Sequence, residues 1–290
     1  MLDTIASVEG LLSKPEKEKP SGEKEKPSAR WVTFTGICTF ILYVFGYLTL
    51  RFHLNSFGVD TDLAVLDERY LFAGAQFLVY FATSLPVAIP IILFGHWVLW
   101  KLRIDRWPNG VILAGIVVSV VLIQFIIRKC LVFTNLLLRE DGLPQPGWMQ
   151  ALLLDGNGAR QFLYFTGLVV AIGVLASALW QAVGVGGESV RVSGAALALL
   201  IAIQFLMLPV TFGVLIADKS VARVSTLDGK DKLKSNEQAW RIWEGKEGTT
   251  FFVVEWEGAT RKAKTLVTLD KKKIEATRIS GYDPVLKLLY

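Results

Sequence analysis

Acidic residues are absent from five long apolar stretches of this chain. A bilayer's hydrocarbon core is about 30 Å thick, and about 20 helical residues at about 1.5 Å each cross it. A soluble protein seldom contains even one such run. The sequence therefore predicts a polytopic integral membrane protein, and this class agrees with 52% hydrophobic residues and nine tryptophans.

Histidine and cysteine, which supply much of enzyme and metal chemistry, are nearly missing, with two of each in 290 residues. His53 and His96 are predicted at opposite membrane faces and so cannot ligate one metal ion or haem together. The predicted spans likewise separate Cys38 from Cys130, which excludes a disulfide between them. The chain also has no phosphate-binding glycine loop, nucleophile elbow or zinc-protease motif. We expect a protein that is not an enzyme and holds no cofactor or metal.

The lack of charge inside the apolar stretches also bears on transport. Proton-coupled transport usually needs an intramembrane Asp, Glu or His. The predicted spans offer neutral groups instead, such as Gln76, Gln124 and Gln204. We interpret these glutamines as groups that form hydrogen bonds between helices.

Residues 1–30 lack the small and apolar run of a cleavable signal, so we expect the first apolar segment to remain as an anchor. Residues 14–30 are rich in Lys, Glu, Pro and Ser, a composition that cannot bury enough apolar surface to fold. The sequence therefore predicts that residues 1–30 form a disordered charged tail.

The fold class that we predict is a membrane all-α bundle of five transmembrane helices, followed by a small extramembrane antiparallel β domain. The bundle occupies residues 31–217. Its spans are predicted at residues 31–50, 70–100, 110–138, 162–183 and 192–217. Pro86 and Pro90, one turn apart in the second span, predict a kink.

The fourth and fifth spans are joined by a short glycine-rich turn, so we expect them to form an antiparallel hairpin. Small residues recur at a spacing of four in both, at Gly173 and Ser177 and at Ala198 and Ala202. Such spacing lets helix backbones approach closely in lipid. These four residues are our candidates for helix packing.

Basic residues flank the spans and are candidates for lipid or partner contact. Lys101, Arg103 and Arg106 lie beside several tryptophans between the second and third spans, a pattern typical of an interfacial belt and a cytoplasmic loop. Arg128 and Lys129 interrupt the third span. Two interpretations stay open: the pair reaches the far interface, or it lies nearer mid-membrane and marks a functional site that pairs with a headgroup or a partner's carboxylate.

Five spans place the two termini on opposite sides of the membrane. Basic residues in the short loops and the tail favour a cytoplasmic N-terminus, whereas the lysines and arginine that directly follow the fifth span favour the reverse. Because short loops weigh most, we expect the N-terminus in the cytoplasm and the C-terminal domain on the opposite side. The short loops suggest a bacterial inner (plasma) membrane.

Residues 218–290 change to an alternating pattern that predicts a small, basic, β-rich extramembrane domain. This segment contains 15 Lys and Arg against 11 Asp and Glu. We predict strands at residues 239–243, 249–256, 265–269 and 274–280. The motif of an RNA-binding sheet is absent, so we expect anionic lipid headgroups rather than nucleic acid as the partner of this charge.

The sequence thus favours a non-catalytic accessory or scaffold subunit of a larger membrane complex, in contact with membrane lipids and with other membrane protein subunits. Two alternatives stay open. A homo-oligomeric pore could form a transport or channel component around the kinked second span, lined by Gln76, Thr83 and Ser84. The chain could also be a membrane-anchored adaptor whose β domain binds a soluble partner.

Overall fold

The computed structural model describes residues 27–59, 68–103, 106–132, 136–138, 158–185, 187–215, 220–229, 233–245, 248–258, 260–270 and 274–284. Most of the predicted charged tail, at residues 1–26, lies outside this set. The chain divides into two compact units, Met1–Phe40 and Ile41–Tyr290. The first unit contains the beginning of the first helix, and every contact reported below lies within the second.

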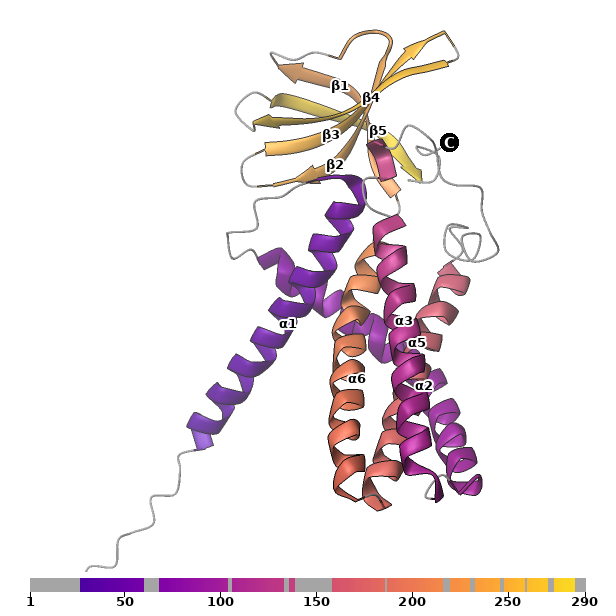
Figure 1. Ribbon diagram of the computed structural model, residues 1–290. Helices are drawn as coiled ribbons and strands as arrows, with labels where there is room; N and C mark the ends of the chain where they lie inside the picture. The colour runs from indigo at the N-terminus through magenta and orange to yellow at the C-terminus, as the bar shows by residue number, and fades with distance from the viewer. Residues whose placement is uncertain are drawn as a thin grey trace, which may run out of the picture. The chain divides into compact units, whose positions relative to one another are not determined.

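Five helices are long and apolar enough to cross a membrane, as predicted. Their bounds are α1 Pro27–Phe57, α2 Glu68–Lys101, α3 Pro108–Val132, α5 Gly158–Val185 and α6 Glu188–Leu215 (Figure 1). Four of them are longer than the predicted spans, because the helical backbone continues past the apolar residues into the polar flanks. The third span was predicted to reach residue 138, but α3 ends at Val132, and a short 3-10 helix, η3 (Leu136–Leu138), follows.

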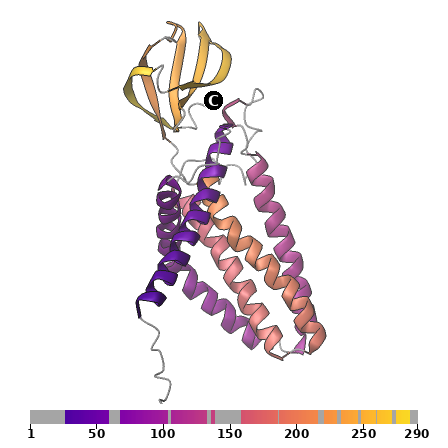
Figure 2. The same cartoon turned by 90° about the vertical axis from the view of Figure 1, so that its left-hand side faces the viewer.

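The helix ends have identifiable local causes. Glu68 and Glu188 lie in the first turns of α2 and α6, where a negative charge stabilises the positive end of the helix dipole. Pro108 begins α3, at a position where its missing N–H costs nothing. Pro86 and Pro90 lie inside α2, which changes direction along its length (Figure 2). That bend agrees with the kink predicted from the two prolines.

Helices α5 and α6 pack against each other and form the centre of the bundle. Helix α3 packs on both, and α2 packs mainly on α5. The predicted hairpin is present, since residues 186–187 alone separate α5 from α6. Phe77 of α2 contacts Phe165 of α5 and Phe212 of α6 edge to face, with ring centroids 6.3 and 5.8 Å apart, and all three belong to one buried cluster.

A five-stranded antiparallel sheet follows the helices. Its strands are β1 Ser220–Gly229, β2 Glu237–Glu244, β3 Gly248–Glu257, β4 Thr260–Asp270 and β5 Ile274–Pro284, in the spatial order β4-β3-β2-β1-β5 (Figure 1). The four predicted strands are confirmed, and β1 was missed. In β1 the neighbours Val221 and Ala222 are both buried, so the strand lacks the alternation of apolar and polar residues on which the prediction relied. Register shifts between Arg223 and Val224, and between Val224 and Thr226, also interrupt its pairing with β5.

The sheet is strongly curved (Figure 2). It has buried apolar side chains on both faces. In β3, Phe252 and Val254 belong to one buried cluster, and Phe251 belongs to another. Successive residues of a strand point to opposite faces, so this strand contributes to two cores. The Phe251 cluster also contains Val224, Ala239 and Leu269 and lies within the sheet itself.

Candidate functional site

Helices α1 and α2 cross at two glycines that bring their backbones into contact. A Cβ added to Gly46 would lie 2.8 Å from the Gly74 nitrogen and closer still to the Tyr70 carbonyl. One added to Gly74 would lie 3.2 Å from the Gly46 nitrogen and 2.9 Å from the Leu42 carbonyl carbon. No side chain fits at either position, which is the close approach that lipid-embedded helices use.

Helices α1 and α6 are joined by polar contacts one turn apart. The Thr49 hydroxyl donates to the Pro209 carbonyl at 3.2 Å, and His53 Nδ1 lies 3.1 Å from the Gly213 carbonyl. Gly213 also approaches the α1 backbone, since an added Cβ would lie 2.9 Å from the Thr49 carbonyl carbon. His53 therefore joins two helices through a contact with a backbone carbonyl.

The four residues predicted for helix packing do not share one interface. Gly173 faces α2, where an added Cβ would lie 2.7 Å from Ile92 Cγ1. Ser177 is half-buried, whereas Ala198 and Ala202 are exposed on α6. The tightest crossings use Gly46, Gly74 and Gly213 instead. Each stands in an apolar run, but the sequence does not say which helix it meets.

None of the three glutamines predicted to bond between helices does so with a residue that the structure describes. Gln181, which the sequence reasoning missed, joins α5 to α2: its Nε2 lies 3.0 Å from His96 Nδ1 and donates to the His96 carbonyl at 3.1 Å. Gln204 is 1% exposed, and neither of its amide atoms hydrogen-bonds to a residue that the structure describes. Gln76 and Gln124 are exposed. The sequence shows which residues are glutamines and can form hydrogen bonds. The rotation of each helix about its own axis, which the sequence does not show, decides which glutamines face another helix.

An apolar cluster joins the helix ends to the sheet. It contains Leu54 and Phe57 at the end of α1, Val59 just after it, Leu137 of η3, and four strand residues, Val221, Trp240, Phe252 and Val254. Val214 of α6 and Tyr164 of α5 pack against its edge. We call this cluster the helix–sheet joint. It fixes the sheet to the helices through buried aromatic and aliphatic contacts rather than through a linker alone.

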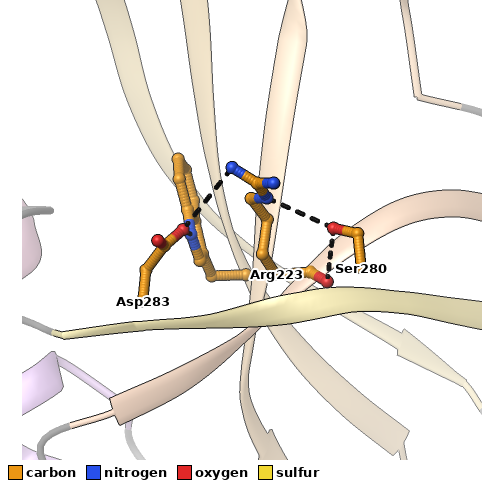
Figure 3. Close-up of polar contacts among 4 residues, drawn as sticks. Arg223, Ser280 and Asp283 are labelled. Atoms are coloured by element: carbon orange, nitrogen blue, oxygen red, sulfur yellow. Dashed lines mark hydrogen bonds and ion pairs between the residues drawn. The ribbon is translucent and has the colours of Figure 1, made fainter.

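Polar contacts on the sheet support the joint. Trp240 Nε1 donates to Asp283 Oδ2 at 2.9 Å, and the same oxygen lies 4.0 Å from the Arg223 guanidinium (Figure 3). Arg223 Nε donates to the Ser280 hydroxyl at 3.2 Å, and that hydroxyl lies 3.3 Å from the Arg223 carbonyl. The contacts tie β2, β1 and β5 together and satisfy the indole N–H of a side chain that is 5% exposed.

A cavity of about 400 Å³ lies beside the joint, lined by the ends of α1 and α2 and by β1, β2 and β5. Arg69, at the start of α2, donates to the Glu244 carbonyl and lies 5.0 Å from the centre of the Trp243 ring. Arg241 pairs with the Glu244 carboxylate at 3.3 Å. The volume of this cavity falls in the range of small-molecule sites. Arg69 and Arg241 already contact Glu244, however, so we interpret both arginines first as structural.

Three of the basic candidates, Lys101, Arg103 and Arg106, lie where α2 leads into α3, at the opposite end of the bundle from the joint. Lys101 Nζ lies 5.0 Å from the centre of the Trp97 ring, and Arg103 and Arg106 are exposed. Arg103 has a φ of 52°, and its carbonyl accepts from the Arg106 N–H at 3.0 Å. The turn thus directs several cations outward near a tryptophan, the arrangement of an interfacial loop.

Arg128 is exposed in the last part of α3, and the side chain of Lys129 lies outside the described residues. The helix continues through both positions to Val132. The two interpretations of this pair, an interfacial one and an intramembrane one, therefore stay predictions.

The described residues contain no group of three or more His, Cys, Asp or Glu that could hold a metal ion. Comparison with known proteins adds no function: no protein-family model matches the chain, and neither a curated protein nor a solved structure is detectably similar to it. What the geometry defines is a bundle of five apolar helices joined to a curved sheet. Any function must be argued from its surfaces.

Proposed function

We propose that the chain is an integral membrane protein that acts as a non-catalytic accessory or scaffold subunit of a larger membrane complex. In this proposal all five helices cross the bilayer, and helix surfaces dock beside other membrane subunits. The joint holds the sheet in a fixed place at the membrane surface, where it is presented to the complex.

The observation that carries the proposal is the exposure of two amides inside apolar helices. Gln76 lies eight residues after the start of α2, and Gln124 lies eight residues before the end of α3. Neither amide hydrogen-bonds to a residue that the structure describes. Lipid tails offer no hydrogen-bonding groups, so an outward glutamine in the hydrocarbon is costly unless another helix meets it. Both positions therefore favour lateral contact with further helices.

The helix–sheet joint supports a scaffold over a tethered adaptor. Phe252 and Leu54 are at most 1% exposed, so strand and helix side chains share one buried core. A sheet that moved freely on a tether would expose this core to water. The adaptor alternative, in which the β domain alone binds a soluble partner, requires the sheet to fold in isolation and bind that partner.

A gentle-detergent purification of the tagged chain at native abundance, with mass spectrometry of co-migrating proteins on a native gel, tests the proposal. A large complex of fixed composition is expected, and a lone monomer would contradict it. Q76L and Q124L should each weaken association of the chain with the complex by about threefold to tenfold. This is the range that follows from the strength of a hydrogen bond between membrane helices. The matched control is V79L, an apolar change at a residue of α2 that is 65% exposed.

A homo-oligomeric pore is the second candidate. Gln76 and Thr83 are both exposed and lie seven residues apart, which places them on one face of α2. Ser84 is fully buried and donates to the Phe81 carbonyl at 2.7 Å, so it belongs to a different face. A pore would therefore use the Gln76 and Thr83 face. A homo-oligomer on the native gel, with solute flux in liposomes that Q76L reduces, would favour this candidate over the subunit.

We also propose a bacterial inner membrane with the N-terminus in the cytoplasm and the sheet on the opposite side. Support comes from the basic loop between α2 and α3 and from Arg191, which follows the turn between α5 and α6. Ile112 of α3 packs with Ala182 and Val190, so these two connections lie at the same end of the bundle. Single cysteines placed in that loop and in the sheet, labelled with an impermeant reagent in intact cells, test the orientation.

A further inference from the structure

An apolar groove of about 610 Å³ runs between α5 and α6 near the turn that joins them. Small residues leave the space for this groove and line it: Ala176 and Gly184 on α5, and Gly194, Ala195 and Ala198 on α6. Larger apolar side chains, including Leu179 and Ile201, line it as well. Its volume lies within the range of about 300–1,000 Å³ found for small-molecule sites.

The groove has a cation at one end. Arg191 lines it from the first turn of α6, with an exposed side chain. No ion pair or hydrogen bond of this guanidinium is formed with the residues that the structure describes. Trp180, 80% exposed, lines the same groove from α5. An arginine and a tryptophan near a helix end are the residues that favour the headgroup level of a bilayer.

The length of the groove selects its occupant. Arg191 and Ile201 are ten residues apart, which the helical rise converts to about 15 Å. That is about half of a hydrocarbon core of about 30 Å, which is the depth of one leaflet. A partner helix would need a surface that crosses the whole core, whereas an acyl chain needs one leaflet and a cation at the headgroup.

We propose that this groove binds an anionic phospholipid, with its phosphate at Arg191 and one acyl chain along Ala195 and Ala198. The inference rests on the proposed membrane insertion and deepens it by naming a site and a ligand class. Basic pockets between membrane helices are known to bind acidic headgroups. The aliphatic lining supplies the contact for the chain, and the arginine supplies the preference for negative charge.

Binding of phosphatidylglycerol and phosphatidylcholine to the purified full chain in detergent, counted by native mass spectrometry, tests the site. The wild type should bind phosphatidylglycerol about fivefold more tightly, as one basic residue at an anionic surface predicts. R191Q should remove that preference and keep the weaker binding. A198F should fill the groove and remove binding of both lipids at this site. A202F is the matched control, because Ala202 is also exposed on α6 but lies outside the lining.

Trp180 provides a second readout that does not depend on counting lipids. Phosphatidylglycerol with brominated acyl chains should quench the wild type more than W180F, and A195L or A198F should abolish that difference. Unchanged lipid binding in A198F and A195L, or an undiminished preference in R191Q, would overturn the groove. Alkaline extraction of the membranes separates the two proposals: if the wild-type chain is extracted, membrane insertion itself is wrong, whereas a retained chain with unchanged variants rejects the groove alone.

Discussion

The two ends of the helical bundle are held by different physics. At the sheet end, backbones touch at glycines, Thr49 and His53 bond to carbonyls of α6, and an aromatic joint buries Phe252. At the loop end, an aliphatic cluster around Ile112 and Leu197 packs α3, α5 and α6, Gln181 bonds to His96, and cations and tryptophans are exposed. One end therefore fixes a sheet in place, and the other presents the basic and aromatic residues that we propose lie at the membrane surface.

The largest effect is expected where α1 crosses α2. In G46L the new side chain has to displace the Tyr70 carbonyl, so the helices must separate. We expect a loss of about 3 kcal/mol, the upper range for overpacking. Thermal unfolding, with size-exclusion chromatography as the readout, measures this loss of stability. G167L is the control, because an added Cβ at Gly167 meets nothing within 4 Å. Equal stability of G46L and G167L would show that the crossing does not hold the sheet end together.

The glycine crossing also shows where sequence reasoning stops. The five helices follow from composition alone, because about 20 apolar residues cannot remain in water. Four strands follow from alternation, and β1 was missed because its buried residues, Val221, Ala222 and Val224, do not alternate regularly with polar ones. Which small residue meets which helix depends on rotation about the helix axis, so Gly173 packs on α2 while Ala198 faces outward. The lining of the α5 and α6 groove follows from that same rotation.

The joint can be separated from the core of the sheet by two adjacent residues. F252A and F251A should each cost about 3–5 kcal/mol, since both rings are almost fully buried. F252A should increase amide hydrogen exchange in residues 54–59 of α1 as well as in the strands. F251A should increase it in the strands alone, because its cluster lies within the sheet. Identical exchange patterns in the two variants would mean that the joint does not couple helix and sheet.

The Trp240 and Asp283 hydrogen bond predicts a smaller, non-additive effect. D283A leaves the buried indole N–H without an acceptor and should cost about 1–3 kcal/mol. W240F removes the donor, so D283A added to W240F should cost clearly less than D283A alone. Chemical denaturation of the four proteins closes this double-mutant cycle. Additive costs would indicate that water or another group already satisfies the indole.

The loop end offers the smallest change, at the turn that follows α2. Arg103 has a φ of 52°, a conformation that glycine adopts without strain. R103G should therefore raise thermal stability in neutral detergent, by about 0.5–1 kcal/mol. In phosphatidylglycerol the gain should shrink, because in the proposed membrane placement the variant has also lost a cation at the level of the headgroups. R103K, with its charge and Cβ retained, should match the wild type both in neutral detergent and in phosphatidylglycerol. If the gain of R103G is the same in both, the charge of this residue does not act at the membrane surface, and the difference between the two ends rests on packing alone.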